Sequence, residues 1–231
     1  MLIPEHKGLF IHIPKTAGQS VEDYFLNTMG RDRTEDNSKY LLGINTNQEG
    51  PRRLAHLTAK EHVALGHIDS QDFESYFKFS FVRNPWERLV SLYRFRGFSS
   101  VCSFAVFVDR YLEYYLAHEN WFFKPQVDFI YDENDHLLCD FVGRMENLQQ
   151  DFDTILARLS LPQGMLPHHN KSKEKWLSVK TFKLYLKHPS LLYQGQRPPR
   201  VRDYRDHYSA KTLAQVHRLY ERDIRLLNYQ F

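Results

Sequence analysis

The fold is decided by the stretch Ile11-His12-Ile13-Pro14-Lys15-Thr16-Ala17-Gly18-Gln19-Ser20. The apolar run of residues 8–13 that leads into it is typical of a buried strand. Pro14 and Gly18 then predict a tight turn. Apolar residues recur at helical spacing afterwards, so we expect a helix from about Ser20. Together these patterns predict a strand, a turn and a helix in that order.

A turn of this kind is suited to binding an anion. Several backbone N–H groups at the start of the helix lack partners, and the helix dipole adds to their attraction for negative charge. Lys15 contributes a compact positive charge, and Gly18 would let the backbone approach a phosphate closely. Thr16, Gln19 and Ser20 offer further donors. The alternative is a structural turn with an incidental lysine.

The order of residues differs from that of a Walker A loop, in which glycine precedes lysine in G-x-x-x-x-G-K-[ST]. Here Lys15 comes before Gly18, and Gly8 lies seven positions ahead of the lysine. An ordinary ATPase or GTPase loop is therefore disfavoured.

A second junction of strand and helix is predicted at residues 79–91, FSFVRNPWERLVS. The preceding apolar run, residues 77–82, indicates a strand. Asn84 is a typical helix N-cap, Pro85 suits the first helical position, and Glu87 completes a capping box. The helix then presents an apolar stripe at helical spacing, made of Trp86, Leu89, Val90 and Tyr93.

Two residues of this junction are candidates for a second phosphate site. Arg83 stands at the carboxyl end of the strand, where ligands bind in open α/β sheets. Ser91 lies two turns into the helix, away from the apolar stripe. The alternative is that Arg83 only pairs with a carboxylate such as Glu87.

The remaining patterns complete the prediction of the fold. Residues 62–67 (HVALGH) are predicted as another strand, and amphipathic helices are predicted at residues 104–115, 148–159 and 209–227. Alternating strands and helices predict an α/β fold with a central parallel sheet flanked by helices. No linker or repeat divides the chain, so we expect one domain.

The composition, with 42% hydrophobic and 26% charged residues among 231, is that of a globular protein with one sizeable core. Cys102 and Cys139 predict neither a disulfide framework nor a zinc site.

The N-terminus lacks an apolar run that would suit a signal peptide or an anchor. We therefore predict a cytoplasmic protein without a membrane span. The alternative is an anchor that precedes these residues.

Positive charge is concentrated between Lys171 and Arg202, where nine basic residues accompany one acid, Glu174. A local surplus of this size indicates an anionic ligand nearby. We therefore predict a basic insertion or lid at about residues 171–203. The alternative is a solvated, flexible loop.

The two junctions together resemble a known pair of motifs. Their sequences are HIPKTAGQS (residues 12–20) and FVRNPWERLVSLY (residues 81–93). The pair is similar to the PAPS-binding pair of the sulfotransferase superfamily, where PAPS is 3'-phosphoadenosine 5'-phosphosulfate. Within that superfamily it resembles the carbohydrate type, heparan sulfate 2-O-like, of sulfotransferase family 2. The resemblance implies a P-loop-NTPase-like sulfotransferase fold across residues 1–231.

The resemblance also implies which residues hold the cofactor. The first loop would bind the 5'-phosphosulfate, and the second, through Arg83 and Ser91, would bind the 3'-phosphate. Lys171 and Ser172, in a segment like the family's C-terminal cofactor-covering region, would reach the donor from the other side. Gln19 departs from the threonine that is usual in the family. The first loop comprises Lys15, Thr16, Ala17, Gly18, Gln19 and Ser20.

Sulfuryl transfer requires a base, and histidine titrates near neutrality, at a pKa of about 6.5. By resemblance to the family's G-H element, Gly66-His67 supplies the catalytic base, His67; the alternative is a structural or substrate-orienting role. Lys15 would neutralise charge on the bridging oxygen. No metal-binding pattern is present, since the adjacent His168 and His169 do not share a helix face.

The predicted reaction moves a sulfuryl group from PAPS to a hydroxyl by in-line displacement and leaves adenosine 3',5'-bisphosphate. The acceptor is expected to be a carbohydrate, anionic if the basic stretch serves it, and not a nucleic acid. Residues 120–126 (NWFFKPQ) either line a sugar site or pack in the core. Two alternatives remain open: a Mg²⁺-dependent P-loop phosphotransferase and a non-catalytic polyanion-binding domain.

Overall fold

The computed structural model describes residues 1–46, 49–167, 179–193 and 201–231. They form two compact units, each assembled from two separate parts of the chain. Unit 1 comprises Met1–Arg83 and Lys124–His169; unit 2 comprises Asn84–Phe123 and Asn170–Phe231. The single domain expected for residues 1–231 stays a prediction.

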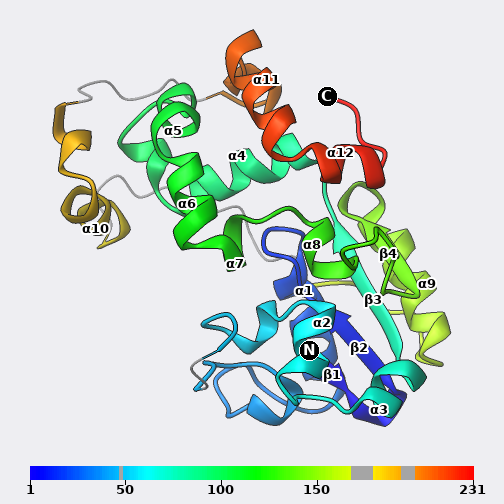
Figure 1. Ribbon diagram of the computed structural model, residues 1–231. Helices are drawn as coiled ribbons and strands as arrows, with labels where there is room; N and C mark the ends of the chain where they lie inside the picture. Colours follow the sequence, from blue (N-terminus) through cyan, green and yellow to red (C-terminus); the bar gives the residue numbers. More distant parts are fainter. Residues whose placement is uncertain (47–48, 168–178, 194–200) are drawn as a thin grey trace. The chain divides into compact units, whose positions relative to one another are not determined.

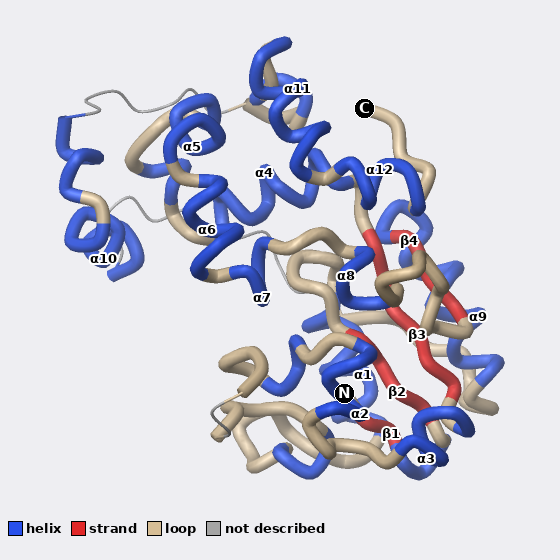
Figure 2. Tube along the Cα trace, viewed as in Figure 1, coloured by secondary structure: helices blue, strands red, loops and turns tan. Residues whose placement is uncertain are grey.

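Unit 1 contains a four-stranded sheet in the order β1-β2-β3-β4 (Figures 1 and 2). The first strand runs antiparallel to the second, and the other neighbours are parallel, with Gly8 opposite Phe77 and Phe79 opposite Phe141. The predicted α/β class with a mostly parallel central sheet is therefore confirmed. The strands are β1 (Leu2–Ile3), β2 (Gly8–Ile11), β3 (Phe77–Val82) and β4 (Phe141–Arg144).

One face of the sheet is covered by the amphipathic helices α1 (Gly18–Thr28) and α9 (Leu148–Arg158). Phe10 of β2 stacks on Phe79 of β3 at 5.3 Å between ring centroids. Helix α9 also contacts β4, beside which Figure 1 draws it. The helices bury their apolar stripes in the same core, through Val21, Phe25, Phe152 and Ile155.

The strand predicted at residues 62–67 is wrong. This segment belongs to α2 (Ala59–Ala64) and the turn after it. Thr58 and Glu61 form a capping box just ahead, which fixes the start of a helix. The alternating pattern of HVALGH fits a strand as well as a helix, and the capping box favours the helix. Unit 1 also contains the short helices α3 (Ser70–Ser75) and α8 (Val127–Ile130).

Unit 2 is helical around an aromatic core, and the predicted N-cap Asn84 and first-turn Pro85 of α4 (Pro85–Phe95) are confirmed. The Asn84 side chain accepts from the N–H groups of Trp86 and Glu87, at 3.1 and 3.2 Å. The other helices are α5 (Phe104–Arg110), α6 (Leu112–His118), α7 (Asn120–Phe123), α10 (Val179–Lys187), α11 (Ala210–Leu219) and α12 (Glu221–Leu226).

Two of the predicted helices are each divided in two. The breaks fall at Tyr111 and Tyr220, whose rings are buried. Tyr220 donates its hydroxyl to the Phe123 carbonyl at 2.8 Å. Short 3-10 helices are η1 (Pro4–His6), η2 (Ser38–Tyr40), η3 (Leu54–His56), η4 (Phe98–Ser100), η5 (Met145–Asn147), η6 (Pro189–Tyr193) and η7 (Arg205–His207).

Much of the predicted basic lid lies outside the described residues, which include only residues 179–193 and 201–203 of it. The lid stays a prediction. Cys102 and Cys139 are free and buried. No helix in the described part of the chain is both long and apolar enough to cross a membrane.

Candidate functional site

The loop between β2 and α1 has the backbone of an anion-binding nest. Lys15 and Ala17 adopt left-handed conformations, with φ of 73° and 66°, on either side of Thr16. Non-glycine residues rarely adopt this strained conformation, which concentrates at functional sites. Alternating handedness turns successive N–H groups toward one concavity. Within the described residues, the N–H groups of Thr16, Ala17 and Gly18 have no hydrogen-bond partner.

Side chains of the loop hold its shape. Thr16 is buried, and its hydroxyl donates to the Ile13 carbonyl at 2.9 Å. That hydroxyl hydrogen is used within the turn, so the backbone N–H is the donor that Thr16 can offer a ligand. Ser20 donates its N–H to the Ala17 carbonyl at 3.0 Å and begins the hydrogen bonding of α1.

Gly18 is required by the packing of the loop, whereas its predicted role in the approach of a phosphate stays a prediction. A Cβ at this position would lie 2.0 Å from Cδ2 and 2.1 Å from Nε2 of His12. The imidazole of His12 thus fills the space that a side chain at Gly18 would need. Any larger residue must displace this buried ring, so the loop depends on the contact between Gly18 and His12.

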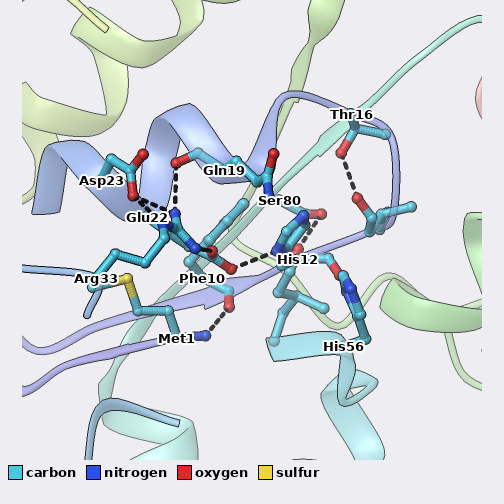
Figure 3. A network of polar contacts seen from close by, with 12 residues as sticks. Met1, Phe10, His12, Thr16, Gln19, Glu22, Asp23, Arg33, His56 and Ser80 are labelled. Atoms are coloured by element: carbon cyan, nitrogen blue, oxygen red, sulfur yellow. Dashed lines mark hydrogen bonds and ion pairs between the residues drawn. The ribbon is translucent and has the colours of Figure 1, made fainter. Parts of the chain in front are cut away.

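His12 is held in turn by Glu22 of α1 (Figure 3). Its Nδ1–H donates to Glu22 Oε1 at 2.5 Å, and both side chains are buried. Burial by itself raises the pKa of Glu22, but the His12 imidazole and the Arg33 guanidinium outweigh it and lower the pKa to about 2. The ionised carboxylate therefore joins the end of β2 to the first turns of α1.

Arg33 closes this network from the segment after α1 (Figure 3). It donates to Glu22 Oε2 at 2.9 Å and, through Nε, to Asp23 Oδ1 at 2.5 Å. A third bond runs to the Gln19 carbonyl at 3.0 Å. The Gln19 carbonyl is thereby fixed, while the Gln19 side chain is exposed.

His56 packs on the other side of His12. Its Nδ1–H donates to the His12 carbonyl at 3.1 Å, and the two rings meet edge to face at 4.6 Å. Burial, and then the neighbouring His12, lower the pKa of His56 to about 3. His56 is therefore neutral near pH 7 and supports the loop without adding charge.

His67 follows α2 in a turn rather than at the end of a strand. Its N–H donates to the His62 carbonyl at 3.0 Å, and Gly66 before it has a φ of 70°. The side chain is half-buried, and its Nε2 is shielded from solvent with no hydrogen-bond partner among the described residues. Burial lowers the pKa of His67, so its imidazole is neutral near pH 7 and able to accept a proton.

Arg83 extends from the carboxyl end of β3 in unit 1. Its backbone N–H and carbonyl are both bound by the side-chain amide of Gln126, at 2.9 and 2.8 Å. Gln126 was noticed in the sequence only as part of residues 120–126. In that segment Phe122 and Phe123 are buried, which favours the core-packing interpretation for these two rings.

The structure places Lys15 to Ala17 on the loop before α1 and Gly18 to Ser20 in the first turn of α1, all in unit 1, to which His67 and Arg83 also belong. Ser91 lies on α4 in unit 2 and is half-buried. Lys171 and Ser172 lie outside the described residues. Among the described residues, no three His, Cys, Asp or Glu side chains are grouped to hold a metal ion.

Comparison with known proteins identifies the family of the chain. The model of the sulfotransferase family matches residues 1–230. The chain belongs to the sulfotransferase family. A protein of Archaeoglobus fulgidus described as uncharacterized is 29% identical over 101 residues, which cover 40% of this chain and 75% of that protein. No solved structure matches the chain. Membership of the sulfotransferase family indicates sulfotransfer as the general class of reaction for the chain.

Replacing Gly18 by alanine tests the packing on His12. The added methyl group collides with the ring, and overpacking of this kind lowers the free energy of unfolding by about 1–3 kcal/mol. Urea denaturation measures the loss. In a His12→Ala background the ring is gone, so Gly18→Ala is expected to cost less. Equal costs in both backgrounds would show that the ring is not what requires glycine.

Replacing Glu22 by glutamine tests the buried carboxylate. Because the pKa of Glu22 is lowered from 4.5 to about 2 in the folded protein, the stability it contributes is present above pH 4.5 and is lost as the pH falls toward 2. Unfolding experiments should therefore show a larger difference between wild type and Glu22→Gln at pH 6 than at pH 3. The exposed Glu74→Gln serves as control. A difference independent of pH would contradict the assigned role.

Proposed function

We propose that this sulfotransferase moves a sulfuryl group from PAPS to a carbohydrate hydroxyl. The observation that carries the proposal is the nest at Lys15 and Ala17, which opens directly into the first turn of α1. Oriented N–H groups at a helix start suit a phosphate or phosphosulfate. In this assignment Lys15, Thr16, Ala17, Gly18, Gln19 and Ser20 surround the 5'-phosphosulfate.

The second junction is assigned to the 3'-phosphate of PAPS. Arg83 is the main ligand, because a guanidinium can offer two parallel N–H groups to phosphate oxygens. The proposal also assigns Ser91 of α4, Lys171 and Ser172 to donor binding, of which Lys171 and Ser172 lie outside the described residues. A 3'-phosphate distinguishes PAPS from ATP, so this junction accounts for the choice of donor.

The transfer is a single in-line displacement. The acceptor oxygen forms a bond to sulfur while the bond from sulfur to the bridging oxygen breaks, and adenosine 3',5'-bisphosphate leaves. His67 accepts the hydroxyl proton, which its neutral imidazole allows. Lys15 neutralises the negative charge that develops on the bridging oxygen. The anionic character of the acceptor is inferred from the nine basic residues between Lys171 and Arg202.

The experiment is a transfer assay from labelled PAPS to a panel of polysaccharides, with wild type, His67→Ala and the control His136→Ala. Loss of a general base lowers turnover by about 10²–10⁴-fold, so His67→Ala should show this loss and retain nucleotide affinity. His136 is exposed, and its replacement should leave turnover unchanged. Near-normal turnover in His67→Ala would remove His67 from the mechanism.

The pH profile gives an independent prediction. Because burial lowers the pKa of His67 from 6.5, the base remains neutral to below that value. Wild-type kcat/KM should therefore fall only at pH values under 6.5, and this acidic limb should be missing from the residual activity of His67→Ala. An acidic limb with its midpoint above 6.5 would contradict the proposal.

A further inference from the structure

The side chain of Gln126 is fully buried, and both ends of its amide bind the backbone of Arg83. Oε1 accepts from the N–H of Arg83 at 2.9 Å, and Nε2 donates to the carbonyl of Arg83 at 2.8 Å. All four atoms belong to unit 1. Paired donor and acceptor contacts to a single residue are what a neighbouring strand offers within a sheet.

The Gln126 amide binds the chain just beyond the end of the strand pairing. The pairing of β3 with β4 ends at Val82 opposite Arg144. Arg83 is the next residue, and Gln126 binds both polar groups of its backbone where the strand pairing has ended. The backbone of Arg83 is therefore held in place one residue beyond the ladder, although it is no longer part of the strand.

Gln126 is itself held in place. It is the N-cap residue of α8, and its carbonyl accepts from the N–H of Phe129 at 3.0 Å. Pro125 restricts the backbone just before it. The amide thus projects from a rigid turn, and its contacts fix the φ and ψ angles of Arg83 and so the direction of the Arg83 Cα–Cβ bond.

We propose that Gln126 is a positioning residue that aims Arg83 and thereby sets the preference for nucleotides that carry a 3'-phosphate. The inference rests on the proposed function, in which Arg83 binds that phosphate. A guanidinium discriminates through two N–H groups in a fixed plane. An arginine on a loose strand end keeps its charge but loses the pre-organisation that two-point binding needs.

The test compares adenosine 3',5'-bisphosphate with adenosine 5'-monophosphate, which differs only by the 3'-phosphate. Calorimetry measures both affinities for wild type and Gln126→Met, which has similar size and no amide. We expect the affinity ratio to fall by about tenfold, the scale of one charge-assisted contact, through weaker binding of the bisphosphate alone. Arg83→Ala should abolish the preference, and adding Gln126→Met to it should change the ratio no further.

A matched control is Gln149→Met. Gln149 also binds backbone with both ends of its amide, to the Gly164 carbonyl at 3.0 Å and the Leu166 N–H at 3.2 Å. Its loss should lower stability without altering the affinity ratio. If Gln126→Met fails to fold, the affinity ratio of the two nucleotides is measured for Gln126→Glu instead. It keeps the acceptor for the Arg83 N–H, places a second oxygen against the Arg83 carbonyl, and is expected to reduce the ratio.

The outcomes separate this inference from the proposed function. If wild type shows no preference for the bisphosphate, the assignment of Arg83 to a 3'-phosphate fails, and the inference fails with it. If wild type shows the preference and the Gln126 variants retain it, or lose both affinities equally, Gln126 is a structural residue only. A selective loss of bisphosphate affinity, absent in Gln149→Met, supports the positioning role.

Discussion

The hydrogen bond between His12 and Glu22 is the contact on which the candidate site depends. It joins the end of β2 to α1 within a buried region, where a carboxylate without partners would be costly. The same imidazole occupies the space beside Gly18, so the position of His12 determines the path of the loop. Arg33 and His56 fix this pair from two further segments. The left-handed backbone at Lys15 and Ala17 is thus held by side chains that need not touch the ligand themselves.

The two junctions of strand and helix are stabilised by different means. The first relies on charge, because Glu22 remains ionised between the His12 imidazole and the Arg33 guanidinium. The second relies on the neutral amide of Gln126, which holds the backbone of Arg83 at the end of β3. Acid should therefore loosen the first junction and leave the second intact. In both cases the group assigned to the ligand is separate from the group that orients it.

The sequence predicted elements correctly wherever several local signals agreed. The helix after Asn84 has a cap, a proline and an apolar stripe, and its start was placed correctly. Residues 62–67 had only an alternating pattern, and with the capping box at Thr58 they form the end of α2 and the turn after it instead. Strand β4 was missed because its four residues include Gly143 and Arg144. Within the site, the loop was recognised from its own residues, whereas the contact of Arg83 with Gln126 spans 43 positions and leaves no local pattern.

Binding of nucleotides tests the central claim most directly, since the two junctions are assigned to the two phosphate ends of one donor. Calorimetry should compare adenosine 3',5'-bisphosphate with ATP, each with and without Mg²⁺. The account predicts that the bisphosphate binds more tightly than ATP and that Mg²⁺ does not change its affinity. A protein that selects ATP or ADP, or that binds only with Mg²⁺, would contradict the account and favour a phosphotransferase.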